Sequence, residues 1–217
     1  MAVLPLFPLG TVLVPGAQLP LQVFEPRYLQ LLSDLVEHQD ERTPVFGVVA
    51  IREGFEVGDD GVRALYPVGC AAQLTHAAAM GEGRFLIVST GLARFHLDAV
   101  EEPADTPYLR GVVSWLDEPL GDPGAVADHA TPLRTEVARY RDDVGAEPLE
   151  PPDDPAELAY WMPHAMTFDL GDRQGLLASS DTEARLRLAL QLVRRERAVL
   201  DSLGAVGRPP DPPVNLN

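Results

Sequence analysis

The segment that decides the fold lies at the start of the chain. It reads Leu4-Pro5-Leu6-Phe7-Pro8-Leu9-Gly10, followed by Leu19-Pro20-Leu21 and Phe24-Glu25-Pro26-Arg27-Tyr28. Short apolar runs separated by proline and glycine predict short strands joined by tight turns, with a further strand over residues 20–24. Pro26 predicts the first turn of a helix, where a proline costs no hydrogen bond. The opening of the chain therefore favours strands that lead into one helix.

Strands are also predicted for the rest of the first half. A continuous apolar run over residues 45–52 is typical of a buried strand, and the acidic, glycine-rich residues 53–61 are interpreted as a hairpin loop. Several short strands with one helix predict a small, partly closed barrel over residues 1–120. The other expected strands are 69–76, 84–88, 92–97 and 108–116, with the middle two separated by Thr90-Gly91.

From about residue 123 the pattern becomes helical. Apolar residues recur at helical spacing over residues 123–143, and Asp154 with Pro155 predicts the start of a helix that runs to Met162. Ser180-Asp181-Thr182-Glu183 matches a capping box and predicts a last helix that ends near residue 203. Residues 121–203 are therefore expected to form a helical subdomain, and the proline-rich residues 204–217 a disordered tail. The predicted fold class is α+β.

The charge and composition of the chain argue against several partners and mechanisms. It carries 33 acidic residues against 17 basic ones, for a formal net charge of -16. Such a charge repels phosphate and anionic lipid, so neither nucleic acid nor a membrane is expected as a partner. All basic residues are arginine, which excludes a Schiff-base lysine or a phosphate-loop lysine. Cys70 is the only cysteine, which excludes an internal disulfide and suits the cytoplasm.

No catalytic residue, metal ligand or cofactor is predicted. The chain lacks the phosphate-loop and G-x-S-x-G signatures, and its five histidines form no H-E-x-x-H pair. Paired carboxylates such as Asp59-Asp60 and Asp153-Asp154 lie in polar stretches and are interpreted as solvated charge. Cys70 stands among apolar residues, which favours a buried side chain over a reactive thiol.

The ordered motifs at the N-terminus resemble the opening of the substrate-binding domain of Lon-type proteases, which has a similar L-P-L-F-P-L segment followed by L-P-L-x-x-F-E-P-R-Y. Further matches follow in order. Phe46-Gly47-Val48-Val49 resembles the F-G-V strand of that family, Val68-Gly69-Cys70 its turn into the next strand, and Gly91 to Arg94-Phe95 its G-x-x-R-F segment. Gln174 and Arg185-Leu186 resemble its helical ending. The resemblance covers roughly residues 3–203.

This resemblance implies a PUA-like β pseudo-barrel followed by a helical bundle, and a role in recognising unfolded polypeptides. Neither the AAA+ ATPase nor the peptidase of that family is expected, because the phosphate-loop motif is missing and a serine-lysine dyad needs a lysine. The chain is interpreted as a free-standing, ATP-independent and non-catalytic module of protein quality control, with its oligomeric state left open. A scaffold with one dedicated protein partner and an uncharacterised hydrolase are the alternatives.

Two groups of residues are candidates for contact with a polypeptide. Phe24 and Tyr28 come from the N-terminal motif, and Trp161, Met162 and Phe168 would line a groove where the barrel meets the helices. Two alternatives stay open: Arg27 pairs with a carboxylate while Tyr28 packs on the barrel, and Trp161 and Met162 belong to a core. The motif residues expected to have structural roles are Phe7, Pro8, Gly10, Glu25, Pro26, Arg27, Gly47, Gly69, Arg94 and Phe95.

Overall fold

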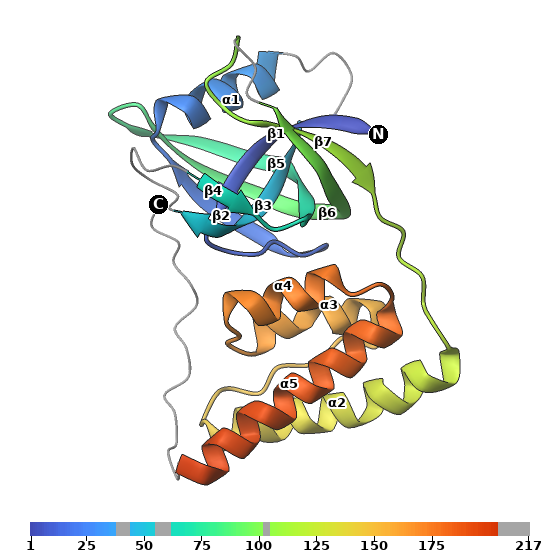
Figure 1. Ribbon diagram of the computed structural model, residues 1–217. Helices are drawn as coiled ribbons and strands as arrows, with labels where there is room; N and C mark the ends of the chain where they lie inside the picture. Colours follow the sequence, from blue (N-terminus) through green and yellow to red (C-terminus); the bar gives the residue numbers. More distant parts are fainter. Residues whose placement is uncertain (38–43, 55–61, 102–104, 204–217) are drawn as a thin grey trace. The chain divides into compact units, whose positions relative to one another are not determined.

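The computed structural model describes residues 1–37, 44–54, 62–101 and 105–203. These residues form two compact units, one that extends to Asp117 and one that begins at Glu118. The first unit contains the strands and one helix, and the second contains the other helices (Figure 1). The predicted α+β class is confirmed. The predicted tail and most of the predicted hairpin loop lie outside the described residues.

Five strands of the first unit close into a barrel. β1 (Ala2–Leu9) pairs in parallel with β3 (Val45–Gly54) and antiparallel with β7 (Arg110–Trp115). β6 (Arg84–Glu101) lies between β7 and β5 (Val68–Gly81), and β5 pairs with β3, which completes the ring. The barrel predicted from the spacing of short strands is therefore present, and its ring of strands is complete.

The interior of the barrel is filled by apolar side chains, some of which pack directly against the backbone of glycine residues. Phe95 is fully buried at its centre. A Cβ atom at Gly47 would lie 3.0 Å from Cζ of Phe95, and one at Gly69 would lie 2.5 Å from the same atom. The missing side chains at these two glycines therefore make room for the ring. The buried cluster consists of Leu4, Leu6, Val49, Ala71, Phe95 and Val113.

Two shorter strands extend this sheet, and one predicted break is absent. β2 (Gln18–Val23) pairs antiparallel with β6, and β4 (Val62–Leu65) pairs with β3. The break predicted at Thr90-Gly91 is wrong, because β6 is one strand of 18 residues. A Cβ atom at Gly91 would lie 2.2 Å from the carbonyl oxygen of Val14. This glycine marks a close approach of two backbone segments and not a turn.

The helix predicted after the first strands is α1 (Pro26–Glu37), and it begins at Pro26 as expected. Its buried residues are Tyr28, Leu31 and Leu32. The ring of Tyr28 stacks on the ring of Phe7 in β1, with centroids 4.0 Å apart and planes inclined by 11°. This aromatic pair fastens the start of α1 to the barrel.

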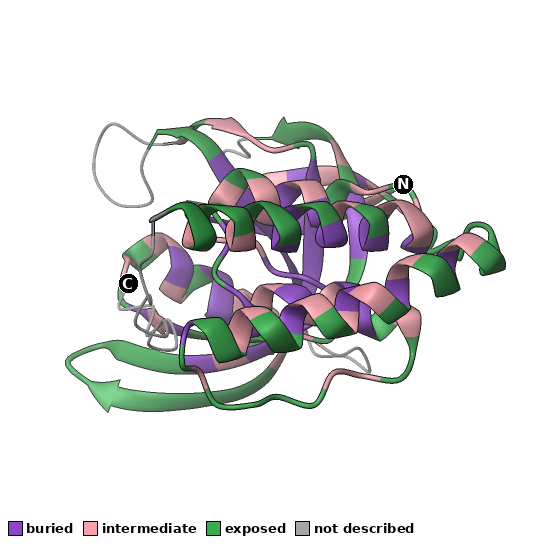
Figure 2. Ribbon diagram, turned by 90° about the horizontal axis from the view of Figure 1, so that it is seen from below, coloured by how far each residue is buried: buried purple, intermediate pink, exposed green. Residues whose placement is uncertain are grey.

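The described part of the second unit contains four helices. α2 (Pro123–Asp143), α3 (Pro155–Ala165) and α5 (Thr182–Leu203) correspond to the three predicted helices. α4 (Leu170–Ala178) is not predicted, since it has nine residues, two of which are glycines that lower its helix propensity. Buried and exposed residues alternate around the long helices, as the colours in Figure 2 show. Each long helix therefore buries one stripe of side chains.

Aspartate side chains cap the starts of these helices. Asp122, Asp154 and Asp169 accept backbone N–H groups at the starts of α2, α3 and α4. The predicted capping box places Ser180 at the start of α5, but the carboxylate of Asp181 accepts the N–H of Ala184 at 2.7 Å. The prediction is wrong by one residue because serine and aspartate are comparable caps and stand side by side here.

Candidate functional site

The first group of predicted contact residues divides between surface and core. Phe24 follows β2 and keeps 42% of its surface exposed, whereas Tyr28 keeps 5%. Arg27 pairs with Glu25 at 2.8 Å, and its guanidinium lies 4.6 Å from the centre of the Tyr28 ring. Glu25, Arg27 and Tyr28 thus hold the start of α1, and Phe24 is the member of this group that is open to a partner.

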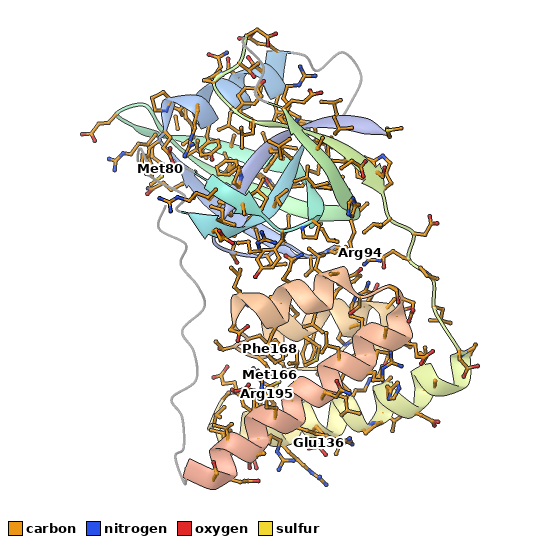
Figure 3. All side chains as sticks on the ribbon, viewed as in Figure 1. Met80, Arg94, Glu136, Met166, Phe168 and Arg195 are labelled. Carbon is orange, nitrogen blue, oxygen red and sulfur yellow. The ribbon has the colours of Figure 1, made fainter. Side chains whose placement is uncertain are left out.

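The second group lies in or against the core of the helical unit. Met162 and Phe168 belong to the buried cluster of this unit, and Trp161 is half-buried against it. Figure 3 shows Phe168 and Met166 among the side chains that fill the helical unit. The polypeptide groove over these residues stays a prediction, and most of the apolar surface of two of its three members is already used in packing.

Other motif residues hold the barrel together. Pro8 lies opposite Val49 in the pairing of β1 with β3, and Gly10 follows directly after β1. Arg94 keeps 1% of its surface exposed, and its Nη2 donates to the backbone oxygen of Asp117 at 2.9 Å. A buried guanidinium at this place fastens the last residue of the first unit to β6.

An exposed hairpin formed by β5 and β6 carries the surface that the sequence analysis does not predict. Every residue from 75 to 86 is exposed, and the outer half of this hairpin has the colour of exposed residues in Figure 2. Three large apolar side chains belong to it: Met80, Phe85 and Leu86 keep 50%, 37% and 41% of their surface exposed. Figure 3 shows Met80 close to the end of the hairpin.

Phe24 adjoins the same hairpin through β2. In the pairing of β2 with β6, Val23 lies opposite Phe85 and Gln22 lies opposite Leu86. The Nε2 atom of Gln22 lies 3.3 Å from the sulfur of Met80. Because Phe85 and Leu86 are neighbours in one strand, their side chains point to opposite faces of the sheet. We name this surface, apolar on both faces, the hairpin patch: Phe24, Met80, Phe85 and Leu86.

The hairpin patch carries little net charge although the chain is strongly acidic. Glu82 and Arg84 lie at the turn and pair at 2.9 Å, so their charges offset one another. An uncovered apolar surface with balanced charge is typical of a site that binds an apolar partner.

A separate pocket of about 420 Å³ lies beside α1 and is lined by residues of α1, β1, β3 and the segment that leads into β7. The hydroxyl of Tyr108 donates to the carboxylate of Asp34 at 2.6 Å inside it. Burial, and then the Asp34 carboxylate, raise the pKa of Tyr108 well above its usual range. The phenol therefore stays protonated and ties α1 to the rest of the barrel unit.

The described residues contain no group of three or more histidines, cysteines or carboxylates placed to hold a metal ion. In the same part of the chain, no helix is long and apolar enough to span a membrane. The thiol of Cys70 is fully buried. The carboxylate of Asp98 accepts hydrogen bonds from Ser114 and His96, in that order of effect, and these lower its pKa. Asp98 is exposed, so we interpret its hydrogen bonds with Ser114 and His96 as a surface network.

A closed barrel with an uncovered apolar hairpin, followed in the chain by a bundle of helices, defines a protein of the α+β class with a surface suited to binding. The chain belongs to the family of substrate-binding domains of the ATP-dependent protease La (LON), whose family model matches residues 3–195.

Two relatives and two solved structures agree with this assignment. The Lon protease of Anaeromyxobacter dehalogenans is 33% identical over 208 residues, and Lon protease 2 of Myxococcus xanthus is 31% identical over 206 residues. These alignments cover 92% and 91% of this chain but 24% of each relative, so the chain spans about a quarter of their length. The crystal structure of a Lon N-terminal domain protein from Xanthomonas campestris is 25% identical, with a TM-score of 0.64, and the alignment covers 89% of this chain and 98% of that one. The N-terminal domain of Mycobacterium avium complex Lon protease has the same fold, with a TM-score of 0.66 at 16% identity and the same coverage.

Proposed function

We propose that this chain is a non-catalytic module that binds unfolded or partly folded polypeptides through the hairpin patch. The observation that carries this proposal is the joint exposure of three large apolar side chains on the β5–β6 hairpin, on both of its faces, together with that of Phe24 at the end of the adjoining strand β2. Membership of a family of substrate-binding domains supports a protein as the ligand. Folded proteins bury their apolar side chains, so a patch of this kind selects segments that unfolding exposes.

The proposed binding needs neither ATP nor metal. Complete burial of one large apolar side chain contributes about 1.5–3 kcal/mol. The patch residues are already half covered, so four of them offer a modest total that association entropy reduces further. Weak, reversible binding with fast release is therefore expected, which suits a module that handles many clients.

Fluorescence anisotropy of a labelled, permanently unfolded polypeptide tests this proposal. The protein is titrated against the unfolded polypeptide and against the folded form of the same polypeptide, each with and without ATP. Saturable binding to the unfolded form alone, unchanged by ATP, is the expected result. Strict dependence on nucleotide, or equal binding of both forms, would contradict the proposal.

A pair of variants in one strand locates the binding surface. Leu86 and Val100 both lie in β6 and are similarly exposed, at 41% and 45%, but only Leu86 belongs to the hairpin patch. We expect Leu86→Ser to weaken binding of the unfolded polypeptide about fivefold or more, and Val100→Ser to leave it unchanged. Equal effects of the two substitutions would place the binding surface elsewhere.

A scaffold with one dedicated partner is the second candidate, and the defined geometry of the hairpin favours it. A patch built on paired strands presents a fixed shape, which suits a complementary partner as well as a range of clients. Isolation of the protein from cells with one stoichiometric companion, together with no binding of the unfolded polypeptide, would favour this second function.

A further inference from the structure

Among the described residues, the outer edge of β5 has no paired strand from Thr75 to Gly81. On one side, β5 pairs with β6 from Val68 to Gly81. On the other side, it pairs with β3 from Cys70 to Gln73, and the N–H of Leu74 donates to the backbone oxygen of Pro44. Beyond Leu74, none of the described strands pairs with this edge. The backbone groups of alternate residues in this stretch therefore point outward, toward solvent.

The sequence of this edge lacks the residue types that usually shield an exposed strand, although two register shifts limit the open edge to a short stretch. It reads Thr75-His76-Ala77-Ala78-Ala79-Met80-Gly81, without proline, lysine or a carboxylate. Register shifts lie at Leu74/His76 and at Ala79/Gly81. Between these two irregularities the pairing of His76, Ala77, Ala78 and Ala79 with β6 is regular. The edge thus offers a short, regular template for one more strand.

The neighbouring side chains define what an added strand would contain. Ala79 lies opposite Phe85 and Ala78 lies opposite Leu86, so each alanine leaves a large apolar side chain of the next strand uncovered. An added strand would lie about 10 Å from β6, which is two interstrand spacings, and long side chains can reach over alanine across that distance. Because Phe85 and Leu86 are on opposite faces, consecutive side chains of the added strand would both find an apolar neighbour.

We infer that the edge of β5 from His76 to Ala79 binds its client as an added β-strand, and that the segment it selects is an uninterrupted apolar run of about four or five residues. This inference rests on the proposed function and names the form in which the polypeptide is bound. Continuous apolar runs are typical of strands buried on both faces in a folded protein. Such a segment is accessible only when its own protein is unfolded, and its backbone is then free to pair.

Backbone methylation of a peptide separates strand addition from simple apolar contact. The probe is a peptide with five consecutive valine, isoleucine or leucine residues between arginine flanks. A second peptide has the same side chains but carries N-methyl groups on two adjacent central residues, so that each edge of the extended peptide loses a donor. We expect the methylated peptide to bind the full chain about tenfold more weakly or worse. In a third peptide, polar and apolar residues alternate in the central segment. We expect it to bind at least about threefold more weakly than the first peptide, because one face of the hairpin then stays uncovered.

Hydrogen exchange of the protein gives an independent readout of the same contact. Amides of residues 75–81 that point outward are expected to become protected when the unmethylated peptide binds. Equal affinity of the methylated and unmethylated peptides, with no new protection in this stretch, would overturn strand addition while leaving the hairpin patch as the binding surface. Failure of the unmethylated peptide to bind, or binding that Leu86→Ser does not weaken, would overturn the proposed function itself and strand addition with it.

Discussion

The guanidinium carbon of Arg185 lies 4.1 Å from the centre of the Tyr160 ring, and the side chain of Arg185 is completely buried. Its Nε donates to the backbone oxygen of Leu176 at 2.9 Å, and its Nη2 lies 3.2 Å from the backbone oxygen of Ser179. The same Nη2 lies 3.4 Å from the carboxylate of Glu118, which also accepts the hydroxyl of Tyr160. One arginine of α5 thus connects α3, the end of α4 and the segment before α2.

The loss of this arginine is expected to destabilise the helical unit. Arg185→Leu should lower the free energy of unfolding by about 2–4 kcal/mol, because buried backbone oxygens lose their donor. Arg185→Lys should recover only part of the lost stability. A lysine ammonium lacks the planar set of N–H donors of a guanidinium, and it stacks poorly on the Tyr160 ring. Arg187 is the matched control: it lies in the same helix but is exposed, and Arg187→Leu should cost within about 0.5 kcal/mol. Urea unfolding followed by helical circular dichroism measures all three, and equal losses at the two positions would show that Arg185 has no special role.

The stacking itself is measurable with a double-mutant cycle. Tyr160→Leu removes the ring, whereas Tyr160→Phe removes only the hydroxyl that bonds Glu118. We expect a coupling energy between Arg185 and the ring of about 0.5–2 kcal/mol, which the phenylalanine variant retains. A cycle that gives no coupling in the leucine variant would mean that the two groups are merely neighbours.

A methyl group at Gly69 is expected to disturb the barrel. The Cβ of Gly69→Ala would lie 2.5 Å from the Phe95 ring and 2.7 Å from the backbone oxygen of Val48. Overpacking of this kind typically costs about 1–3 kcal/mol. Phe95→Leu in the same chain should make the added cost smaller but not remove it, because the contact with Val48 is to backbone. Gly175→Ala provides the comparison. Its added Cβ would lie 3.3 Å from the end of the flexible Leu188 side chain, and alanine has the higher helix propensity. The temperature of thermal unfolding should therefore stay almost unchanged or rise.

The parts of the fold that follow from short-range chemistry were accessible from the sequence. Pro26 marks the start of α1, and Asp154 with Pro155 marks the start of α3, because caps and first-turn prolines act within a few residues. The break predicted at Gly91 is wrong because glycine is required there by the close approach of Val14, which is distant in the chain. A glycine needed for close approach and a glycine needed for a turn look the same in a single sequence.

The candidate site was less accessible for a related reason. The N-terminal motif predicts Phe24 as a contact residue, and Phe24 lies in the hairpin patch, but no motif in the sequence points to Met80, Phe85 or Leu86. The alanine run before Met80 has weak strand propensity, so the predicted strand ends near His76 and the long hairpin is missed. Phe85 and Leu86 look like ordinary core residues in a strand, and only the tertiary structure shows that nothing described covers them. Exposure of an apolar residue is a property of the fold and is not encoded locally.

Alkaline pH is expected to release the contact between Tyr108 and Asp34. The folded pKa of Tyr108 is raised, first by burial and then by Asp34, above the unfolded value of about 10. A group whose pKa is raised on folding stabilises the fold fully below its unfolded pKa, and this contribution is lost as pH rises from that value through the folded pKa. Tyr108→Phe should therefore show a smaller loss of stability above pH of about 10 than the unchanged protein. Asp34→Asn should lower the pKa of Tyr108 only in part, because burial is the larger cause. A pH titration of tyrosinate absorbance compares the pKa of Tyr108 in this variant and in the unchanged protein. Urea unfolding at pH values below and above about 10 measures the stability of Tyr108→Phe.

The dependence of binding on salt separates the hairpin patch from the net charge of the chain. The chain has a formal charge of -16, but Glu82 and Arg84 offset one another beside the patch. A peptide with an apolar centre and uncharged flanks should bind with less than about a twofold change between about 0.01 and about 0.15 M salt, because apolar burial is not screened. The same centre with arginine flanks should bind more tightly at low salt and lose that gain as the charges are screened. Leu86→Ser should weaken both peptides by a similar factor if the apolar centre occupies the patch in each. A steep loss of the uncharged peptide with salt, or an effect of Leu86→Ser on the arginine-flanked peptide alone, would show that the two peptides do not share this surface.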